Sequence, residues 1–475
     1  MIEMRRLFAA SLFCLTLGGC MVGPDYRRPE VEAPQSWRFA EKETKELANT
    51  AWWGQFNDPA LNELIAVALK ESKDLRIAAA RVEDFRGRYA IARAPLFPQI
   101  GASASPGGER TTELGQTQLP AGTPNPVELY QANFFATWEI DLWGKLRRAT
   151  EAARANLLST EEGRRGVILS LVTSVAGAYV NLRDLDRQLE IAKRTAGSRE
   201  ESYRIFTLRF KAGYVSDLEL SQAKSEFERA LATIPTIEKA IAQQEDGLSV
   251  LLGRNPGAIQ RGKSIDELEL PAVPAGLPSD LLERRPDIRQ AEQDLVSANA
   301  QIGVAKAQFF PSISLTGLFG WESTRLSKLF TGPAQMWTWA APITQPIFTG
   351  GAISEGVKAA KAFREEALLQ YEKSIQNAFR DVEDALVDQK RSREQLEAQK
   401  RQVDALRTYA GTARLRYDNG YTSYIEVLDA ERSLFDAELG YTQTKGGLFQ
   451  ALINLYKAMG GGWVAVPDEK SSKTD

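Results

Sequence analysis

Histidine is absent from this chain of 475 residues, and cysteine is nearly absent. Without histidine the sequence lacks the commonest general base and the commonest metal ligand, so no familiar catalytic triad or zinc site is expected. The only two cysteines, Cys14 and Cys20, lie at the N-terminus and cannot form a disulfide within the rest of the fold. Gly144-Lys145 lacks the glycine-rich approach of a phosphate-binding loop. We therefore expect no catalytic residues, no metal and no cofactor.

Strong charge of one sign is also missing. The 59 basic and 62 acidic side chains give a formal net charge of −3, which does not favour a nucleic-acid partner. After the N-terminus we find no run of about 20 apolar residues, so the mature chain is expected to have no transmembrane helix. Any part of it that enters a membrane should do so as a β-barrel.

The N-terminus has the pattern of an export signal. Arg5 and Arg6 precede an apolar stretch from Leu7 to Leu17, as in a signal peptide. The stretch ends in Leu-Gly-Gly-Cys at Cys20, which resembles a bacterial lipobox. The resemblance implies cleavage after residues 1–19 and a covalent lipid on Cys20, which would anchor the protein to a membrane.

The chain is internally duplicated. Asp74–Ile100 matches Asp287–Ile313 without a gap, and Arg209–Ser216 matches Arg416–Ser423. A stretch rich in proline and glycine between the copies is typical of a linker. We therefore divide the chain into a signal peptide (1–19), a lipidated extended segment (20–57), a first repeat (58–253), a linker (254–278), a second repeat (279–462) and a flexible tail (463–475).

Each repeat contains two predicted strands, and the clearest of them alternates with a period of two. Phe134 and Trp138 point one way and Gln131 and Asn133 the other, with Phe135 as the exception. Each strand is near the roughly 9–11 residues that a tilted membrane strand needs. The connections from 106 to 129 and from 321 to 335 should be extracellular loops. The predicted strands are at about 98–106, 130–142, 311–320 and 336–347.

Alternation alone is more typical of a half-buried soluble sheet, but four strands cannot close a barrel. Open edges in lipid leave backbone groups without partners, at a cost of several kcal/mol each. Two chains would give a cramped barrel, whereas three would give a 12-stranded barrel with a polar pore. We therefore expect a homotrimer with lipid contacts on the outer face.

Long helices without proline follow the strands. The chain is compatible with one helix from Gly144 to about Phe210, a length of roughly 100 Å. Another helix should begin at Asp58-Pro59 and run to about Ala94. Heptad spacing predicts coiled-coil seams at Leu182, Leu185, Leu189, Ala192, Ala196, Arg199, Tyr203, Phe206 and Phe210, and at Leu396, Gln399, Val403, Leu406, Ala410, Ala413 and Tyr417.

A glycine follows each seam and favours a sharp end to the helix. Gly213 and Gly420 stand where a left-handed residue terminates a helix. Ser216-Asp-Leu-Glu and Ser423-Tyr-Ile-Glu each have the pattern of a capping box that opens a return helix. Each repeat should therefore end in an antiparallel helical hairpin, with tips near 210–216 and 417–423.

Several motifs resemble the TolC-like family of outer-membrane factors, in the lipoprotein branch that serves RND-type efflux pumps. They are Val22–Tyr26, Trp52-Trp53, Gln345–Phe348, Gly350-Gly351 and Val427–Ser433. The resemblance covers nearly the whole mature chain. It implies an α+β membrane protein: a trimeric 12-stranded barrel, four strands per chain, continuous with a long periplasmic α-helical barrel. It also implies a periplasmic adaptor (membrane fusion) protein and an inner-membrane pump of RND type as partners.

The resemblance also suggests gating residues. Asp429 matches a family aspartate that lines the periplasmic constriction, and threefold symmetry would make it a ring of carboxylates. Tyr417 and Ile425 match positions of a tip link and an apolar ring. Relatives often have a basic residue after that tyrosine, whereas this chain has Asp418, so Arg416 or Arg414 could supply the closing salt bridge. The adaptor should contact the tips, at Gly213, Ser216, Gly420 and Ser423.

Together these observations predict the exit duct of a tripartite efflux pump, located in the outer membrane, that passively conducts drugs, toxic compounds or metal ions. An alternative is a non-conducting envelope lipoprotein that tethers layers through its coiled coils. A secreted hydrolase would need a catalytic constellation that the sequence does not contain. A tether has no need for strands with one polar face, and this feature favours the duct.

Overall fold

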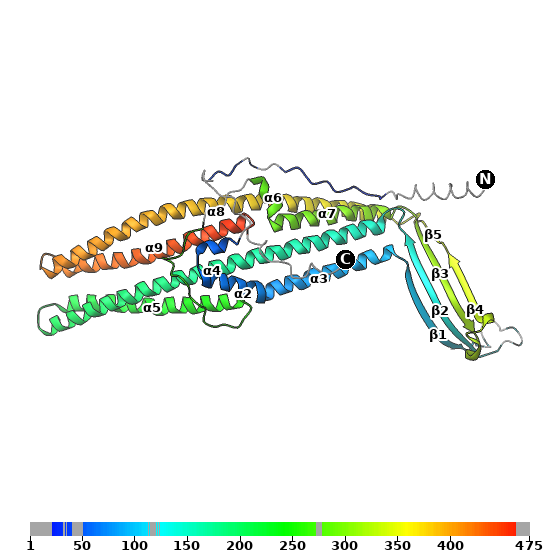
Figure 1. The fold of residues 1–475 in the computed structure, drawn as a ribbon, viewed down its shortest axis with the longest axis horizontal. Helices are drawn as coiled ribbons and strands as arrows, with labels where there is room; N and C mark the ends of the chain where they lie inside the picture. The colour runs from blue at the N-terminus through cyan, green and yellow to red at the C-terminus, as the bar shows by residue number, and fades with distance from the viewer. Residues whose placement is uncertain are drawn as a thin grey trace. The chain divides into compact units, whose positions relative to one another are not determined.

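The computed structural model describes residues 21–31, 34, 36–39, 51–112, 114, 120, 122, 124–271 and 278–461. The chain folds into two compact units. Unit 1 takes residues 1–30, 82–160 and 291–371, and unit 2 takes residues 31–81, 161–290 and 372–475. Both repeats therefore contribute to each unit. Figure 1 labels the helices and strands.

Unit 1 contains an antiparallel sheet in the order β1-β2-β3-β4, with β5 pairing β3. Its central pair, β2 and β3, joins the first repeat to the second, with Phe134 opposite Phe319. The strands are β1 (Gln99–Glu109), β2 (Val127–Ile140), β3 (Ser312–Ser323), β4 (Gln335–Ala340) and β5 (Ile343–Thr344).

The two faces of this sheet differ in polarity, as the alternation predicted. On one face Phe134, Trp337 and Trp339 have 54%, 70% and 72% of their surface exposed. On the other face the Gln131 amide donates a 2.7 Å hydrogen bond to Glu322 on the neighbouring strand. Phe135 breaks the pattern because its ring lies against Gly101, where a side chain would collide with it. Because Gly101 on β1 has no Cβ, the polar face has room for the Phe135 ring.

Proline changes the strand ends. The predicted strand at 336–347 is divided into β4 and β5 because Pro342 lacks the N–H that would continue the ladder. Its carbonyl still accepts a 3.1 Å hydrogen bond from the Ser314 backbone. Pro106 was predicted to open a loop but lies inside β1, opposite Tyr130. It is tolerated there because β1 is an edge strand within the chain.

The first predicted helix is interrupted at Ser72. Asp58 caps it by accepting a 2.9 Å hydrogen bond from the Ala60 backbone, and Pro59 is its first residue. Ser72 adopts ψ of 130°, which is not helical, and the backbone of Glu71 packs beside Gly253. The helix thus becomes α2 (Pro59–Glu71) and α3 (Lys73–Arg93). The other short helices are α6 (Leu281–Arg284) and α7 (Pro286–Ala307), and single turns occur at Trp52–Phe56, Ala94–Leu96, Pro278–Asp280, Leu326–Lys328 and Gly332–Ala334.

Two hairpins of matching length dominate unit 2. In Figure 1 α4 returns as α5, and α8 returns as α9. The helices α4 (Lys145–Lys211) and α8 (Ala352–Asp418) have 67 residues each, and α5 (Asp217–Leu251) and α9 (Tyr424–Ala458) have 35 each. A helix of 67 residues is about 100 Å long. All residues of both predicted heptad seams are buried or half-buried except Phe210.

The core of unit 2 contains part of the predicted linker. Trp52 stacks on Tyr456 with ring centroids 5.0 Å apart, and both rings are fully buried. Ile265 and Leu268 join the same cluster, so the linker from 254 to 271 is packed against the core and is not a free connection.

The helix α4 contains an apolar stretch that we did not expect from the sequence. A window of 18 residues in α4 has a mean hydropathy of 1.3, enough by length and composition to cross a membrane. However, 61% of this window is buried within the fold, as expected for a core helix. We interpret it as part of the unit 2 core.

Candidate functional site at the hairpin tips

Both hairpin tips end their long helix in the same way. Gly213 and Gly420 have φ of 79° and 77°, in the left-handed region that favours glycine. The Gly213 N–H donates to the Phe210 carbonyl and the Tyr214 N–H to the Arg209 carbonyl, each at 2.9 Å. The second tip repeats both bonds, from Gly420 and the residue after it. This pair of bonds is the Schellman motif, and the left-handed glycine at each helix end is the one that the sequence pattern predicted.

The return helices begin differently. Ser216 forms a complete capping box with Glu219: the serine hydroxyl accepts from the Glu219 N–H at 3.3 Å, and the carboxylate accepts from the Ser216 N–H at 2.8 Å. Ser423 has the same extended backbone, but its side chain makes no capping bond within the described residues. The predicted second capping box is therefore wrong. The Glu426 carboxylate lies toward Arg416 instead, at 3.9 Å.

An aromatic cluster connects the two tips. Phe206 of α4 packs against Tyr424 of α9 at a centroid distance of 4.1 Å and stacks with Tyr417 of α8 at 6.2 Å. Val427 and Ala430 are fully buried in the same cluster. Burial raises the pKa of the Tyr424 hydroxyl to about 12. Apolar contacts therefore connect the end of the first hairpin to the start of α9.

Tyr417 is held by a residue of the first hairpin. Its hydroxyl accepts a 3.4 Å hydrogen bond from Arg209, and burial raises the pKa of this hydroxyl. Arg416 points to Glu426, and Arg414 lies 3.6 Å from Asp418 and 3.8 Å from Glu431. Within the chain the Tyr417 hydroxyl is therefore bound by Arg209, and a closing salt bridge from Arg416 or Arg414 stays a prediction.

A buried ion network lies next to the tips. The Arg199 and Glu226 side chains are 4% and 8% exposed and pair at 3.1 Å within the first hairpin. Arg432 of α9 binds the same Glu226 carboxylate. Desolvation lowers the pKa of the Arg199 guanidinium, and the nearby Glu226 carboxylate opposes this effect. The network joins the two hairpins through one shared carboxylate.

Asp429 and Ile425 lie on an exposed face of α9. Ile425 is 59% exposed, and Asp429, one turn later, is also exposed. The Asp429 carboxylate makes no direct ion pair with Arg432. It still helps to raise the pKa of the Arg432 guanidinium, after the larger contribution of Glu226. Gly213, Ser216, Gly420 and Ser423 are exposed as well. The surface at these residues is available for contacts with other chains.

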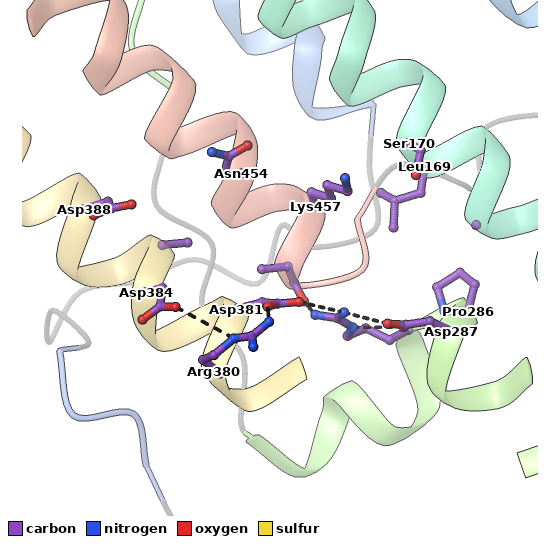
Figure 2. Close-up of a pocket in the computed structure, with 14 residues that line it drawn as sticks. Leu169, Ser170, Pro286, Asp287, Arg380, Asp381, Asp384, Asp388, Asn454 and Lys457 are labelled. Atoms are coloured by element: carbon purple, nitrogen blue, oxygen red, sulfur yellow. Dashed lines mark hydrogen bonds and ion pairs between the residues drawn. The ribbon is translucent and has the colours of Figure 1, made fainter. Parts of the chain in front are cut away.

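Figure 2 shows a separate cavity in unit 2, of about 550 Å³, between α4, α7, α8 and α9. Most of its charges pair with one another: Arg285 contacts Asp287 at 2.6 Å and Asp381 at 3.1 Å, and Arg380 contacts Asp381 at 2.9 Å. The arrangement ties α7 to α8. Because these charges pair with one another, we interpret the cavity as part of the packing of unit 2.

No group of three histidine, cysteine, aspartate or glutamate side chains with metal-binding geometry occurs among the described residues. Cys20, the predicted lipid attachment site, lies outside them.

Comparison with known proteins identifies the family. The model of the outer membrane efflux protein family matches residues 64–254 and 277–461, one stretch in each repeat. The chain belongs to the outer membrane efflux protein family.

Individual relatives agree with this assignment. The chain is 36% identical over 468 residues to the probable efflux pump outer membrane protein TtgC of Pseudomonas putida, covering 97% of this chain and 96% of the relative. It is 35% identical over 459 residues to the cation efflux system protein CusC of Escherichia coli, covering 95% and 98%. A crystal structure of the open MtrE outer membrane channel of Neisseria gonorrhoeae superposes with a TM-score of 0.85 at 32% identity, covering 94% and 99%.

These relatives confirm the predicted family, efflux function and outer-membrane location, and the predicted class of helices combined with a β-sheet. Within this outer membrane efflux protein, sequence reasoning missed Arg209, Glu226 and Arg432. The one signal available was Arg199, a charged residue at a seam position where an apolar one is expected.

Proposed function

We propose that this chain is the exit duct of a tripartite efflux pump. Three copies would close a 12-stranded barrel in the outer membrane, and their hairpins would form an α-helical barrel in the periplasm. An inner-membrane pump of RND type and a periplasmic adaptor would deliver the substrates: drugs, toxic compounds or metal ions. The duct itself would conduct passively, without catalysis or a cofactor.

The sheet of unit 1 carries this proposal. It has one apolar and one polar face, and among the described strands β1 and β4 each have a partner on one side only. An open edge in lipid costs several kcal/mol for each unpaired group, so pairing with further copies is strongly favoured. The exposed Trp337 and Trp339 suit the lipid side, and Gln131 with Glu322 suits a water-filled pore.

The gate is proposed at the second hairpin tip. Three copies of Asp429 near a pore axis would repel one another by on the order of 3 kcal/mol for each pair at about 6 Å. Tyr417, bound by Arg209, would resist this repulsion by tying α8 to the first hairpin. Ile425 would add apolar contacts, and Arg416 with Glu426 would add a weak, exposed pair. The exposed tips at Gly213, Ser216, Gly420 and Ser423 would contact the adaptor.

Lipidation of Cys20 is also proposed. The residues that follow it are tied to the start of α4: the Val22 N–H donates to the Trp143 carbonyl at 3.0 Å, and Asp25 pairs with the buried Arg148 at 2.6 Å. A lipid on Cys20 would therefore lie close to the point where β2 gives way to α4. Mass spectrometry of the mature N-terminus tests this, because an unmodified Cys20 in the purified protein contradicts the anchor.

Planar-bilayer recording on the detergent-extracted protein tests the duct. We expect trimers by mass and a stable ionic conductance after insertion. A monodisperse monomer with full β content would contradict the barrel. A trimer that inserts but does not conduct would favour the alternative of a structural tether.

The same recording tests the gate. Asp429→Asn should weaken block by divalent or trivalent cations added on the periplasmic side, because the ring of charge is lost. Asp217→Asn is the matched control, an exposed acid at the first tip that should leave the block unchanged. Tyr417→Phe should raise the basal conductance by removing the acceptor of the Arg209 hydrogen bond. If Asp429→Asn changes neither conductance nor block, Asp429 is a solvated helix residue and the gate lies elsewhere.

A further inference from the structure

A second cavity in unit 2 has the chemistry of an anion site. It lies between α4, α8 and α9 and has a volume of about 610 Å³. The charged side chains that line it are Arg194, Arg199, Arg407, Arg414, Glu431 and Glu438. The lining side chains by themselves carry a formal charge of +2, although Glu226 and Asp418, which do not line the cavity, also pair with Arg199 and Arg414.

Two of the four arginines are already occupied. Arg194 and Arg407 both bind Glu438, whose side chain is only 9% exposed. Arg407 reaches it with two bonds of 2.9 and 3.2 Å. Because Glu438 already occupies their donors, these two guanidinium groups contribute positive charge to the cavity and few free hydrogen-bond donors.

The other two arginines have donors to spare. Arg199 uses Nη1 for both the carboxylate and the backbone carbonyl of Glu226, each at 3.1 Å, while its buried Nη2 has no acceptor among the residues described. Arg414 has only long contacts, 3.4 Å to the Ser202 hydroxyl and 3.6 and 3.8 Å to two carboxylates. A guanidinium presents its donors as a planar fork that fits carboxylate and phosphate oxygens.

The acid that lines the cavity beside Arg414 is Glu431, at 3.8 Å. Burial raises the pKa of the Glu431 carboxyl, against the opposing effect of Arg414 and Arg199. Burying this carboxylate away from water therefore makes it a poor counter-ion for two arginines. The Arg199 Nη2 donor and the loosely paired Arg414 therefore remain available to an anion.

We propose that this cavity binds a small anion carrying a carboxylate or phosphate group, with Arg199 and Arg414 as its direct donors. Arg199 belongs to the first hairpin and Arg414 to the second, so a bound anion would bridge the two. The site is separate from Asp429, which does not line the cavity.

Isothermal titration calorimetry of the full detergent-solubilised protein tests the proposal. Sodium phosphate and sodium succinate are titrated separately at pH 7.5, with sodium chloride of matched ionic strength as the blank. We expect saturable binding of at least one of the two anions. Binding of phosphate alone identifies a phosphate site, and binding of succinate alone identifies a carboxylate site.

Arg414→Ala should weaken that binding on the order of tenfold or more, the size expected for losing a charge-assisted hydrogen bond. Arg391→Ala is the matched control: this α8 arginine is 64% exposed and does not line the cavity, so binding should persist. Ser198→Glu places a carboxylate in the cavity without removing any arginine and should abolish binding. Absence of saturable heat in the wild type overturns the site. So does equal binding by wild type and the Arg414→Ala and Ser198→Glu variants, or an equal loss in Arg391→Ala.

Discussion

The two hairpins share a backbone plan but distribute their charges differently. Their helices have the same lengths, 67 and 35 residues, and the same Schellman ending at Gly213 and Gly420. Residues of the first hairpin thus align with residues of the second without a gap. Arg199 and Glu226 align with Leu406 and Ser433, so only the first hairpin carries the buried ion pair.

The exposed acid shows the opposite distribution. Asp429 of the second hairpin aligns with Gln222, and Asp418 aligns with Lys211. The first hairpin therefore carries the pair in which both side chains are buried, while the second carries Asp418 and Asp429 on exposed surfaces. Duplication preserved the helix lengths and turns, which depend on local backbone geometry. It left the side chains free to diverge at these aligned positions.

The largest effect should come from the buried pair. Glu226→Ala leaves Arg199 as a buried charge without its carboxylate and removes the link to Arg432. We expect the free energy of unfolding to fall by about 3–5 kcal/mol. Thermal or denaturant unfolding in detergent measures this. The exposed Glu228, on the same helix, provides the control Glu228→Ala, with a change within roughly 0.5 kcal/mol. Equal effects of the two substitutions would contradict the difference between the hairpins.

A second contrast is Asp184 of α4, which aligns with the exposed Arg391 of α8. Burial raises the Asp184 pKa from 3.8 to about 6, and a hydrogen bond from Gln188 lowers it only in part. Between these values the folded state binds more protons than the unfolded state, so stability falls as pH rises from about 4 to 6.

Asp184→Asn should therefore stabilise the protein above pH 6, by up to about 3 kcal/mol, and should have little effect near pH 4. The carboxamide keeps an oxygen for the Gln188 donor. Melting temperatures of wild type and variant at pH 4, 6 and 7.5 measure the difference. The exposed Asp404→Asn is the control and should show no such trend. A gain that is the same at every pH would refute the assigned cause.

The smallest effect concerns the two caps. Ser216→Ala removes a complete capping box and should cost about 1 kcal/mol, whereas Ser423→Ala removes no capping bond and should cost a few tenths at most. Hydrogen exchange of the amides in the first turns of α5 and α9 measures each helix start locally. If both substitutions accelerate exchange equally, Ser423 caps its helix in solution as Ser216 does.

Several elements were predictable because their causes are local. The absence of proline after Gly144 predicted α4, the glycine after each seam predicted both tips, and the period of two predicted the faces of β2. Other elements were not. The break at Ser72 accompanies the packing of Glu71 beside Gly253, and Pro342 divided a strand whose pattern otherwise continued.

By itself the sequence determined the duplication, the lengths of the hairpins, their turns and the polarity of the strands. Each of these follows from contacts within a few residues along the chain, or from the backbone preferences of glycine and proline. Only the tertiary structure decided which charges meet. Arg209 and Tyr417 are 208 residues apart, and Arg432 and Glu226 are 206 apart. Such pairs depend on how whole helices pack, because no local spacing brings a guanidinium of one repeat to a hydroxyl or carboxylate of the other.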